Sequence, residues 1–184
     1  GFRRGILLSR QLLMLTQVTF CFTLLVCLAR VVSASELVVT FAEKQDWPAV
    51  SAQLAAKADV NATQADGTTA MHWAAYHDQA EVIAKLLSAG AKPDEKNRYG
   101  ITPLLLACEN GNERTVQALL KAGAKADVSQ RGGEEAIMIA SRTGRVGVVK
   151  ALLENGARTE SHDRKGQTAL MWAALNGDER MVRL

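Results

Sequence analysis

The chain of 184 residues contains few of the residues on which disulfide frameworks, metal sites and nucleotide sites are built. It has only three cysteines. Two of them, Cys21 and Cys27, lie in an apolar N-terminal run that is expected to be removed as an export signal, so Cys108 alone remains and has no partner for an internal disulfide. The histidines have no cysteine or carboxylate at metal-site spacing, and glycine-rich phosphate motifs are absent. We therefore expect no metal, no cofactor and no enzyme activity.

What the chain does contain is a pattern that returns every 33 residues. Three series of residues keep this step independently of one another. They are the glycines Gly67, Gly100, Gly133 and Gly166; the leucine pairs at 86–87, 119–120 and 152–153; and the Gly-Ala pairs at 90–91, 123–124 and 156–157. Three series with one period are typical of a stacked repeat protein, in which each unit contacts only its neighbours.

Each copy carries the signals of two short helices. Thr69, Thr102 and Thr168 stand where a hydroxyl can accept a hydrogen bond from the first turn of a helix, and Pro103 fits a first helical position. A second helix is predicted after the first helix of each copy, for example from Glu81 to Ser88, where apolar residues recur at helical spacing. The residues that should separate the two helices are Asp78, Gly111, Gly144 and Gly177.

This pattern resembles the ankyrin repeat family, whose signature is Thr-Pro-Leu-His-x-Ala. The copies at 69–74 and 102–107 match it, whereas the third copy has Glu135 in place of the threonine and Met138 in place of the histidine. The resemblance covers residues 36 to 184 and implies an all-α solenoid of stacked helix-turn-helix units with extended turns. It also implies that His72 makes hydrogen bonds between neighbouring turns.

The period divides the chain into units. Residues 35–65 are predicted to be a degenerate first repeat, with helices at 37–42 and 48–56 and Asp46 as the cap of the second helix. The full repeats are expected at 66–98, 99–131 and 132–164, followed by an incomplete repeat at 165–184. Because the next leucine pair would fall beyond Leu184, we expect the sequence to be a fragment.

Residues 1–34 lie outside this pattern. Arg3, Arg4 and Arg10 precede a mainly apolar run, and Val32-Ser33-Ala34 has the small residues that a signal peptidase reads. This predicts a secretory signal peptide cleaved between Ala34 and Ser35, and it resembles an exported ankyrin protein of bacterial type. The alternative is an uncleaved anchor, since the run of about 18 residues is at the lower limit for spanning a bilayer. The protein is thus expected to be periplasmic or secreted, or membrane-anchored if uncleaved.

The charge of the chain changes once this segment is set aside. Residues 1–34 hold four arginines and no acidic residue, which leaves 18 of the 22 basic residues against 19 acidic ones. A nearly neutral body argues against non-specific nucleic-acid binding, which needs a large basic footprint.

The resemblance to ankyrin repeats implies protein–protein interaction through a concave surface formed by the turns and the first helices. The side chains that it places on this surface belong to four units. They are Asp66, Thr68, Tyr76 and His77; Arg98, Tyr99, Ile101, Glu109 and Asn110; Arg131, Glu134, Arg142 and Thr143; and Arg164, Lys165, Gln167, Leu175 and Asn176. Two other functions remain open: a non-catalytic part of a larger enzyme, and a membrane-tethered spacer.

The most regular feature of this set is an arginine row. Arg98, Arg131 and Arg164 stand at equivalent positions two residues before a turn glycine, where an exposed tip is expected. Packed helices lie about 8–10 Å apart, so the three guanidinium groups should form a row. Arginine binds carboxylates in two-point fashion, which predicts a partner with an acidic surface. The alternative is that these are ordinary solvated charges.

Three further features are expected to be structural. Cys108 should be a small buried residue, and Trp73 and Trp172, three periods apart, should pack between units. The acidic pair Glu134-Glu135 is predicted to be a solvated turn tip rather than an acid–base pair.

Overall fold

The computed structural model describes residues 37–184, so the predicted signal peptide at 1–34 lies outside the described residues. Within that range the chain forms ten α-helices and no strand, which confirms the all-α solenoid. The helices are α2 (Val38–Glu43), α3 (Trp47–Ala55), α4 (Ala70–Tyr76), α5 (Ala80–Ser88), α6 (Pro103–Asn110), α7 (Glu113–Lys121), α8 (Ala136–Arg142), α9 (Val146–Glu154), α10 (Ala169–Leu175) and α11 (Glu179–Val182).

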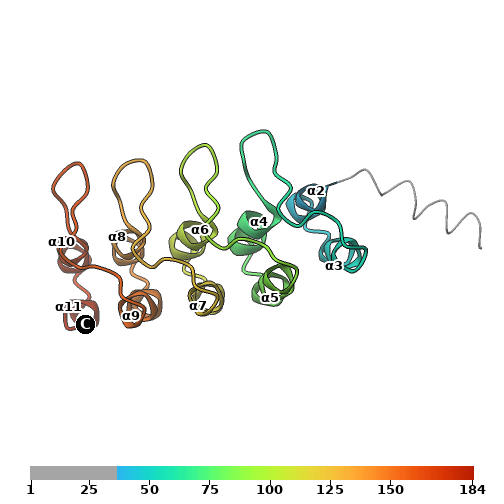
Figure 1. Cartoon of the computed structure of the whole chain (residues 1–184). Coiled ribbons are helices and arrows are strands. Elements are labelled where there is room, and N and C mark those ends of the chain that lie inside the picture. Colours follow the sequence, from blue (N-terminus) through green and yellow to red (C-terminus); the bar gives the residue numbers. More distant parts are fainter. Residues whose placement is uncertain (1–36) are drawn as a thin grey trace, which may run out of the picture. The chain divides into compact units, whose positions relative to one another are not determined.

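The helices of residues 37–184 form two layers (Figure 1). The first helices of the units, α2, α4, α6, α8 and α10, make an inner layer, and the second helices make an outer layer. Among the inner helices, α4, α6 and α8 pack against an inner helix on either side, α2 and α10 pack against one, and each packs against its own outer partner. Extended turns project from the inner layer, each leading into the next inner helix (Figure 1).

The predicted caps begin most inner helices. The hydroxyl of Thr102 accepts a hydrogen bond from the backbone N–H of Leu105 at 3.3 Å, and Thr168 does the same for Met171. Pro103 occupies the first position of α6, as predicted. Asp46 accepts from the N–H of Ala49 at 3.0 Å and so begins α3.

The ends of the first unit differ slightly from the sequence prediction. Leu37 was expected inside the first helix, but α2 begins at Val38 and the Leu37 side chain is 46% exposed. Likewise α3 covers Trp47–Ala55, one residue earlier than expected, because the Asp46 cap fixes its first turn.

The break between the two helices of a unit requires a left-handed residue. Asp78 takes this conformation at φ 54°, in the place that Gly111 takes at φ 73° in the next unit. A non-glycine residue is uncommon there, and Asp78 is held by the Thr115 hydroxyl, which donates to its carboxylate at 2.8 Å. The predicted breaks between the helices are therefore confirmed.

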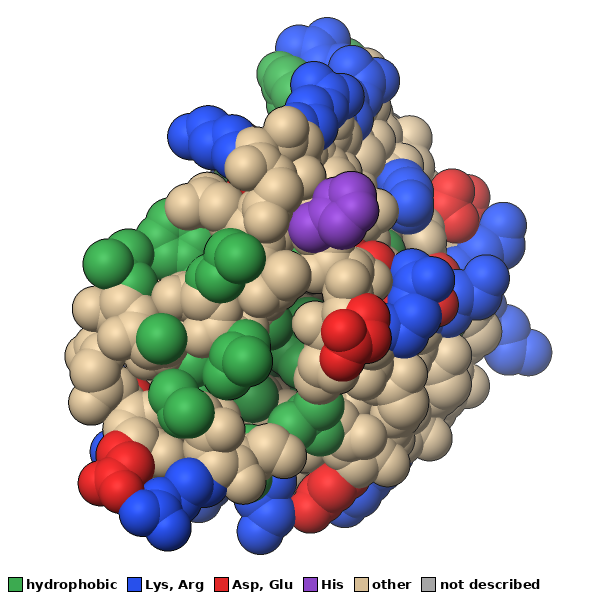
Figure 2. Space-filling view, turned by 90° about the vertical axis from the view of Figure 1, so that its left-hand side faces the viewer, with side chains coloured by type: hydrophobic (Ala, Val, Ile, Leu, Met, Phe, Trp, Pro, Cys, Tyr) green, Lys and Arg blue, Asp and Glu red, His purple; other side chains and the backbone are tan. Residues whose placement is uncertain are grey.

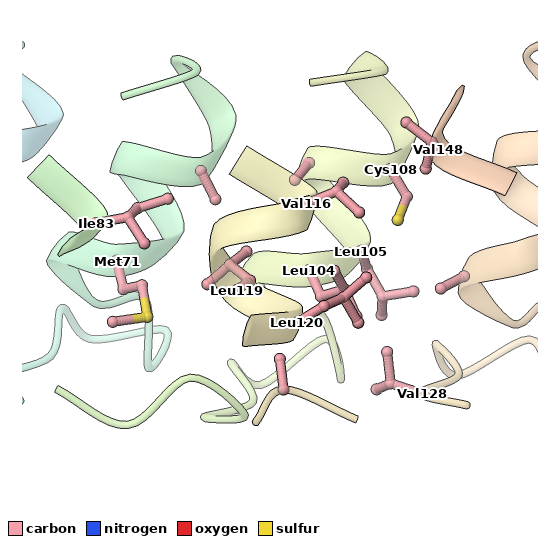
Figure 3. Close-up of a cluster of buried hydrophobic side chains, with 14 of the residues drawn as sticks. Met71, Ile83, Leu104, Leu105, Cys108, Val116, Leu119, Leu120, Val128 and Val148 are labelled. Atoms are coloured by element: carbon pink, nitrogen blue, oxygen red, sulfur yellow. The ribbon is translucent and has the colours of Figure 1, made fainter. Parts of the chain in front are cut away.

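The core runs continuously through the units. Leu104, Leu119 and Ile83 are fully buried, and side chains from neighbouring helices meet between the layers (Figure 3). Cys108 is also fully buried, as predicted, and burial raises the pKa of its thiol far above the usual range. Because each unit shares its apolar face with its neighbours, the array presents its turns on a close-packed base.

A candidate protein-binding surface

The four turns share one backbone geometry. In each, an N–H donates across the turn to the carbonyl four residues later, as in Asn97 to Ile101 at 3.0 Å. Side chains then bind the turn's own backbone: Asn97 accepts from two N–H groups at 3.0 Å, and Asp163 accepts from Lys165 and Gln167 at 2.8 and 2.9 Å. The turns are therefore held in one conformation before any partner arrives.

Neighbouring turns also pack on each other. A side-chain carbon on Gly67 would lie 3.3 Å from Cα of Asn97, and one on Gly100 would lie 3.1 Å from Cγ of Arg131. Both glycines also have positive φ, so a side chain there is disfavoured twice. The N–H of Arg98 donates to the carbonyl of Asp66 at 2.7 Å. Gly67 and Gly100 thus make room for the residues of the following turn.

The three arginines of the predicted row lie on these packed tips, and we call Arg98, Arg131 and Arg164 the tip row. All three are exposed, which confirms the predicted exposure of the tips. Arg164 donates to the carbonyl of Arg131 at 2.7 Å, which joins two members of the row. Basic side chains gather at the turn tips in the end view (Figure 2).

None of the three tip-row guanidinium groups forms an ion pair with another residue between 37 and 184. Arg98 instead donates to the Tyr99 hydroxyl at 2.9 Å and lies 5.1 Å from the centre of that ring. The carboxylate of Asp66 is occupied by the Thr68 N–H, whose hydrogen bond is the main reason that the pKa of Asp66 is lowered. The tip row therefore has no direct ion-pair partner in residues 37–184, although the pKa of the Arg98 guanidinium group is raised, mainly by its hydrogen bond to Tyr99 and in part by the charge of Asp66.

The acidic pair in the third unit is not a solvated tip, contrary to the prediction. Glu135 is only 6% exposed, and one of its oxygens accepts from Arg158 at 2.9 Å. Glu134 accepts from Arg142 at 2.9 Å and from Gln130 at 2.6 Å. The cause is that Glu135 holds the cap position at the base of the turn, where the equivalent Thr69 and Thr102 are buried.

A second group of side chains lies at the C-terminal ends of the inner helices. Trp73, Tyr76 and His77 come from α4 and the residue after it, and Trp47 of α3 joins them. His77 stacks on Trp73 at 6.0 Å between ring centres and meets Trp47 edge-on at the same distance. Trp73 is partly buried against the core, as expected, but it also supports this exposed aromatic cluster.

These features agree with the comparison with known families. A family model described as ankyrin repeats (3 copies) matches residues 38–131 and 123–184. The chain belongs to the ankyrin repeat family. No curated protein matches it by sequence. Ankyrin repeats generally mediate protein–protein interaction and are typically non-catalytic.

The signature histidine of the first full ankyrin repeat has the structural role expected of it. Nε2 of His72 lies 3.0 Å from the carbonyl of Ile101 in the next turn, and Nδ1 lies 3.2 Å from the N–H of Thr69. Since a carbonyl only accepts, Nε2 carries the proton and Nδ1 accepts. Burial is the main reason that the pKa of His72 is lowered, so the neutral ring is favoured.

The predicted binding residues of the ankyrin surface divide by exposure. Thr68 is the exception to the expected exposure: its side chain is only 8% exposed, because the turn of the next repeat packs against this tip. Half-buried residues are Asp66, His77, Ile101, Asn110, Glu134, Thr143 and Gln167. Exposed ones are Tyr76, Arg98, Tyr99, Glu109, Arg131, Arg142, Arg164, Lys165, Leu175 and Asn176.

Sequence reasoning missed Trp47 of the second group and also Glu43, which holds the position of Tyr76 in the preceding unit. Both belong to the degenerate first repeat, which has no signature to align it. The signal was nevertheless present, since Glu43, Tyr76 and Glu109 are each 33 residues apart.

A metal site finds no support in residues 37–184, because no group of three His, Cys, Asp or Glu side chains there could hold a metal ion. Nor is any helix of that range long and apolar enough to cross a membrane.

Proposed function

We propose that this ankyrin repeat chain is exported and binds another protein with the surface formed by its turns and inner helices. Export is supported by the basic start, the apolar run and the Val32-Ser33-Ala34 site of residues 1–34. The mature protein would act in the periplasm or outside the cell, or at the membrane if the segment stays uncleaved. The nearly neutral charge of the repeats disfavours nucleic acid as the ligand.

Sequencing the N-terminus of the protein recovered from outside the cytoplasm tests export. We expect it to begin at Ser35, and we expect Ala34→Trp to give a longer product, because the site needs a small side chain. Recovery of the same product from Ala34→Trp would contradict cleavage after Ala34, and recovery of the whole chain only in the cytoplasm would contradict export.

The tip row is the observation that supports an acidic partner. Its three guanidinium groups are exposed, they have no ion-pair partner in residues 37–184, and they stand on turns fixed by hydrogen bonds. Arginine forks match carboxylates in two-point geometry, and a prearranged row loses little conformational entropy on binding. The partner region is therefore proposed to be an acidic segment or an acidic surface of a protein.

Charge reversal tests the tip row. The variant carries Arg98→Glu, Arg131→Glu and Arg164→Glu, and its matched control carries Lys92→Glu, Lys125→Glu and Lys150→Glu, three exposed residues away from the tips. Binding of a labelled polyglutamate peptide to the full chain is followed by fluorescence anisotropy. We expect the tip variant to bind at least about tenfold more weakly and the control to change by less than about threefold.

The salt dependence is part of the same experiment. Binding by the wild-type chain should weaken as salt rises from about 0.05 to 0.3 M, because exposed charges are screened. Equal weakening in the tip variant and in the control would show diffuse attraction and would overturn the assignment of the acidic partner to the tip row. Helical spectra of both variants must match the wild type.

A further inference from the structure

Tyr76 is an exposed aromatic side chain on a rigid support. It is 48% exposed at the C-terminal end of α4. Its ring meets His77 edge-on at 5.0 Å and Trp73 edge-on at 6.3 Å between centres. Trp73 in turn stacks on His77, and Trp47 closes the group from α3. An aromatic ring fixed in this way offers contact area at little entropic cost, as at the centres of protein interfaces.

Two carboxylates flank this ring. Glu43 and Glu109 hold the position of Tyr76 in the preceding and the following unit, and α2, α4 and α6 pack side by side. Both glutamates are exposed, and neither forms an ion pair within residues 37–184. We call Tyr76 with Glu43 and Glu109 the Tyr76 site.

The carboxylate of Glu43 is tied to the aromatic cluster. Gln64 donates from its amide to Glu43 at 2.7 Å and accepts from the indole N–H of Trp73 at 3.3 Å. On the other side, the Asn110 amide donates to the backbone carbonyl of Tyr76 at 3.0 Å, which joins the ends of α4 and α6. These contacts position the two flanks of the site relative to the ring without using its exposed part.

The electrostatics of the Tyr76 site favour a cation. Two carboxylates are present, the face of a tyrosine ring is electronegative, and the C-terminal ends of three helices carry partial negative charge. The next residue at this position, on α8, is Arg142. Its guanidinium group is paired with the Glu134 carboxylate at 2.9 Å. A guanidinium group suits such a site best, because it stacks on aromatic rings and also pairs with carboxylates.

We infer that the Tyr76 site binds an arginine side chain of the partner protein. The inference rests on the proposed function, since the site lies on the same protein-binding surface, but it uses other residues and the opposite charge. The tip row attracts acidic groups and the Tyr76 site attracts a basic one. A partner with both would dock in one orientation only, because reversing it would place like charges together.

Titration of the full chain with a short peptide tests the inference. The probe is acetyl-Gly-Arg-Gly-Arg-Gly-amide, and its control carries citrulline in place of arginine, which keeps the shape and removes the charge. The chain has only two tyrosines, Tyr76 and Tyr99, and both are exposed, so their ring signals in NMR spectra report the two sites separately. We expect the arginine peptide to shift the Tyr76 signals and the citrulline peptide to leave them in place.

Matched variants complete the test. Glu43→Gln with Glu109→Gln should weaken binding of the arginine peptide about tenfold, whereas Glu81→Gln with Glu113→Gln, on the outer helices, should change it by less than about twofold. Tyr76→Leu should also weaken it and Tyr99→Leu should not. Equal effects of the two double variants, or shifts of the Tyr99 signals as large as those of Tyr76, would overturn the inference.

The charge reversal of the tip row keeps the two proposals apart. That variant should still bind the arginine peptide, because none of its three positions belongs to the Tyr76 site. If it loses polyglutamate binding and keeps arginine binding, both proposals stand. If arginine binding is lost with it, the peptide is responding to the tips and the Tyr76 site is not the receptor.

Discussion

The central unit and the last unit of the array have nearly the same signature but very different surroundings. Leu104 on α6 is fully buried, whereas Leu170, at the equivalent position on α10, is 57% exposed. Met171 is 56% exposed, although the equivalent Met138 on α8 is fully buried. The end view shows this apolar face of α10 and α11 as a group of hydrophobic side chains (Figure 2).

This difference shows that the apolar side chains of a repeat are buried mainly by the neighbouring units. The inner helix of each unit buries one side on the preceding unit and the other on the following unit, so a unit with one neighbour keeps half its apolar face in water. Stability in such an array is roughly a sum of unit and neighbour contributions. Tyr76 and Glu109 of the Tyr76 site, and Arg98 and Arg131 of the tip row, stand on units with a neighbour on each side, whereas Glu43 stands on α2, which packs against one inner helix only among residues 37–184.

The largest expected effect compares two leucines at equivalent positions. Leu104→Ala should lower the free energy of unfolding by about 2–5 kcal/mol, because it leaves a cavity between packed helices. Leu170→Ala should change it by no more than about 0.5 kcal/mol, because that side chain is mostly in water. Denaturant unfolding of the two variants measures both values. Similar losses in the two variants would show that the last unit is packed as tightly as the central one.

A smaller effect compares a buried histidine with an exposed one. The pKa of His72 is lowered from its usual 6.5, so below pH 6.5 the unfolded chain takes up a proton that the folded chain refuses. Stability from this residue is therefore present above pH 6.5 and is lost as the pH falls toward the folded pKa. Melting temperatures from pH 8 to pH 5 should fall less steeply for His72→Asn than for the wild type.

The control for this comparison is His162→Asn. His162 is exposed in the last turn, so its replacement shows what the loss of a histidine outside the core does to the same profile. A profile for His72→Asn that runs parallel to the wild type would mean that the ring makes no contribution to the pH dependence.

The period in the sequence was sufficient to predict the fold because each helix and turn signal occurs at the same place in several units. Capping threonines, Pro103 and the left-handed breaks all follow from local chemistry and were found where expected. The tip row was predictable for the same reason, since its exposure depends only on its place in the turn.

The contacts between units could not be predicted from the repeat pattern. Thr68 is buried by the following turn, and the partner of Glu135, Arg158, comes from the next unit. The aromatic cluster joins Trp47 of the first unit to His77 of the second. A pattern read within one unit says which residues face a neighbour, but the identity of the contact depends on both units at once.

The central claim, that neighbouring units hold the binding surface rigid, is tested most directly by amide hydrogen exchange along the full chain. We expect the amides of α6 and α7 to be the best protected and those of residues 165–184 to exchange fastest among the repeats, because the last unit opens without disturbing the others. The Trp73–Tyr76 segment should share the slow exchange of the interior. A uniform rate across all units would contradict the claim.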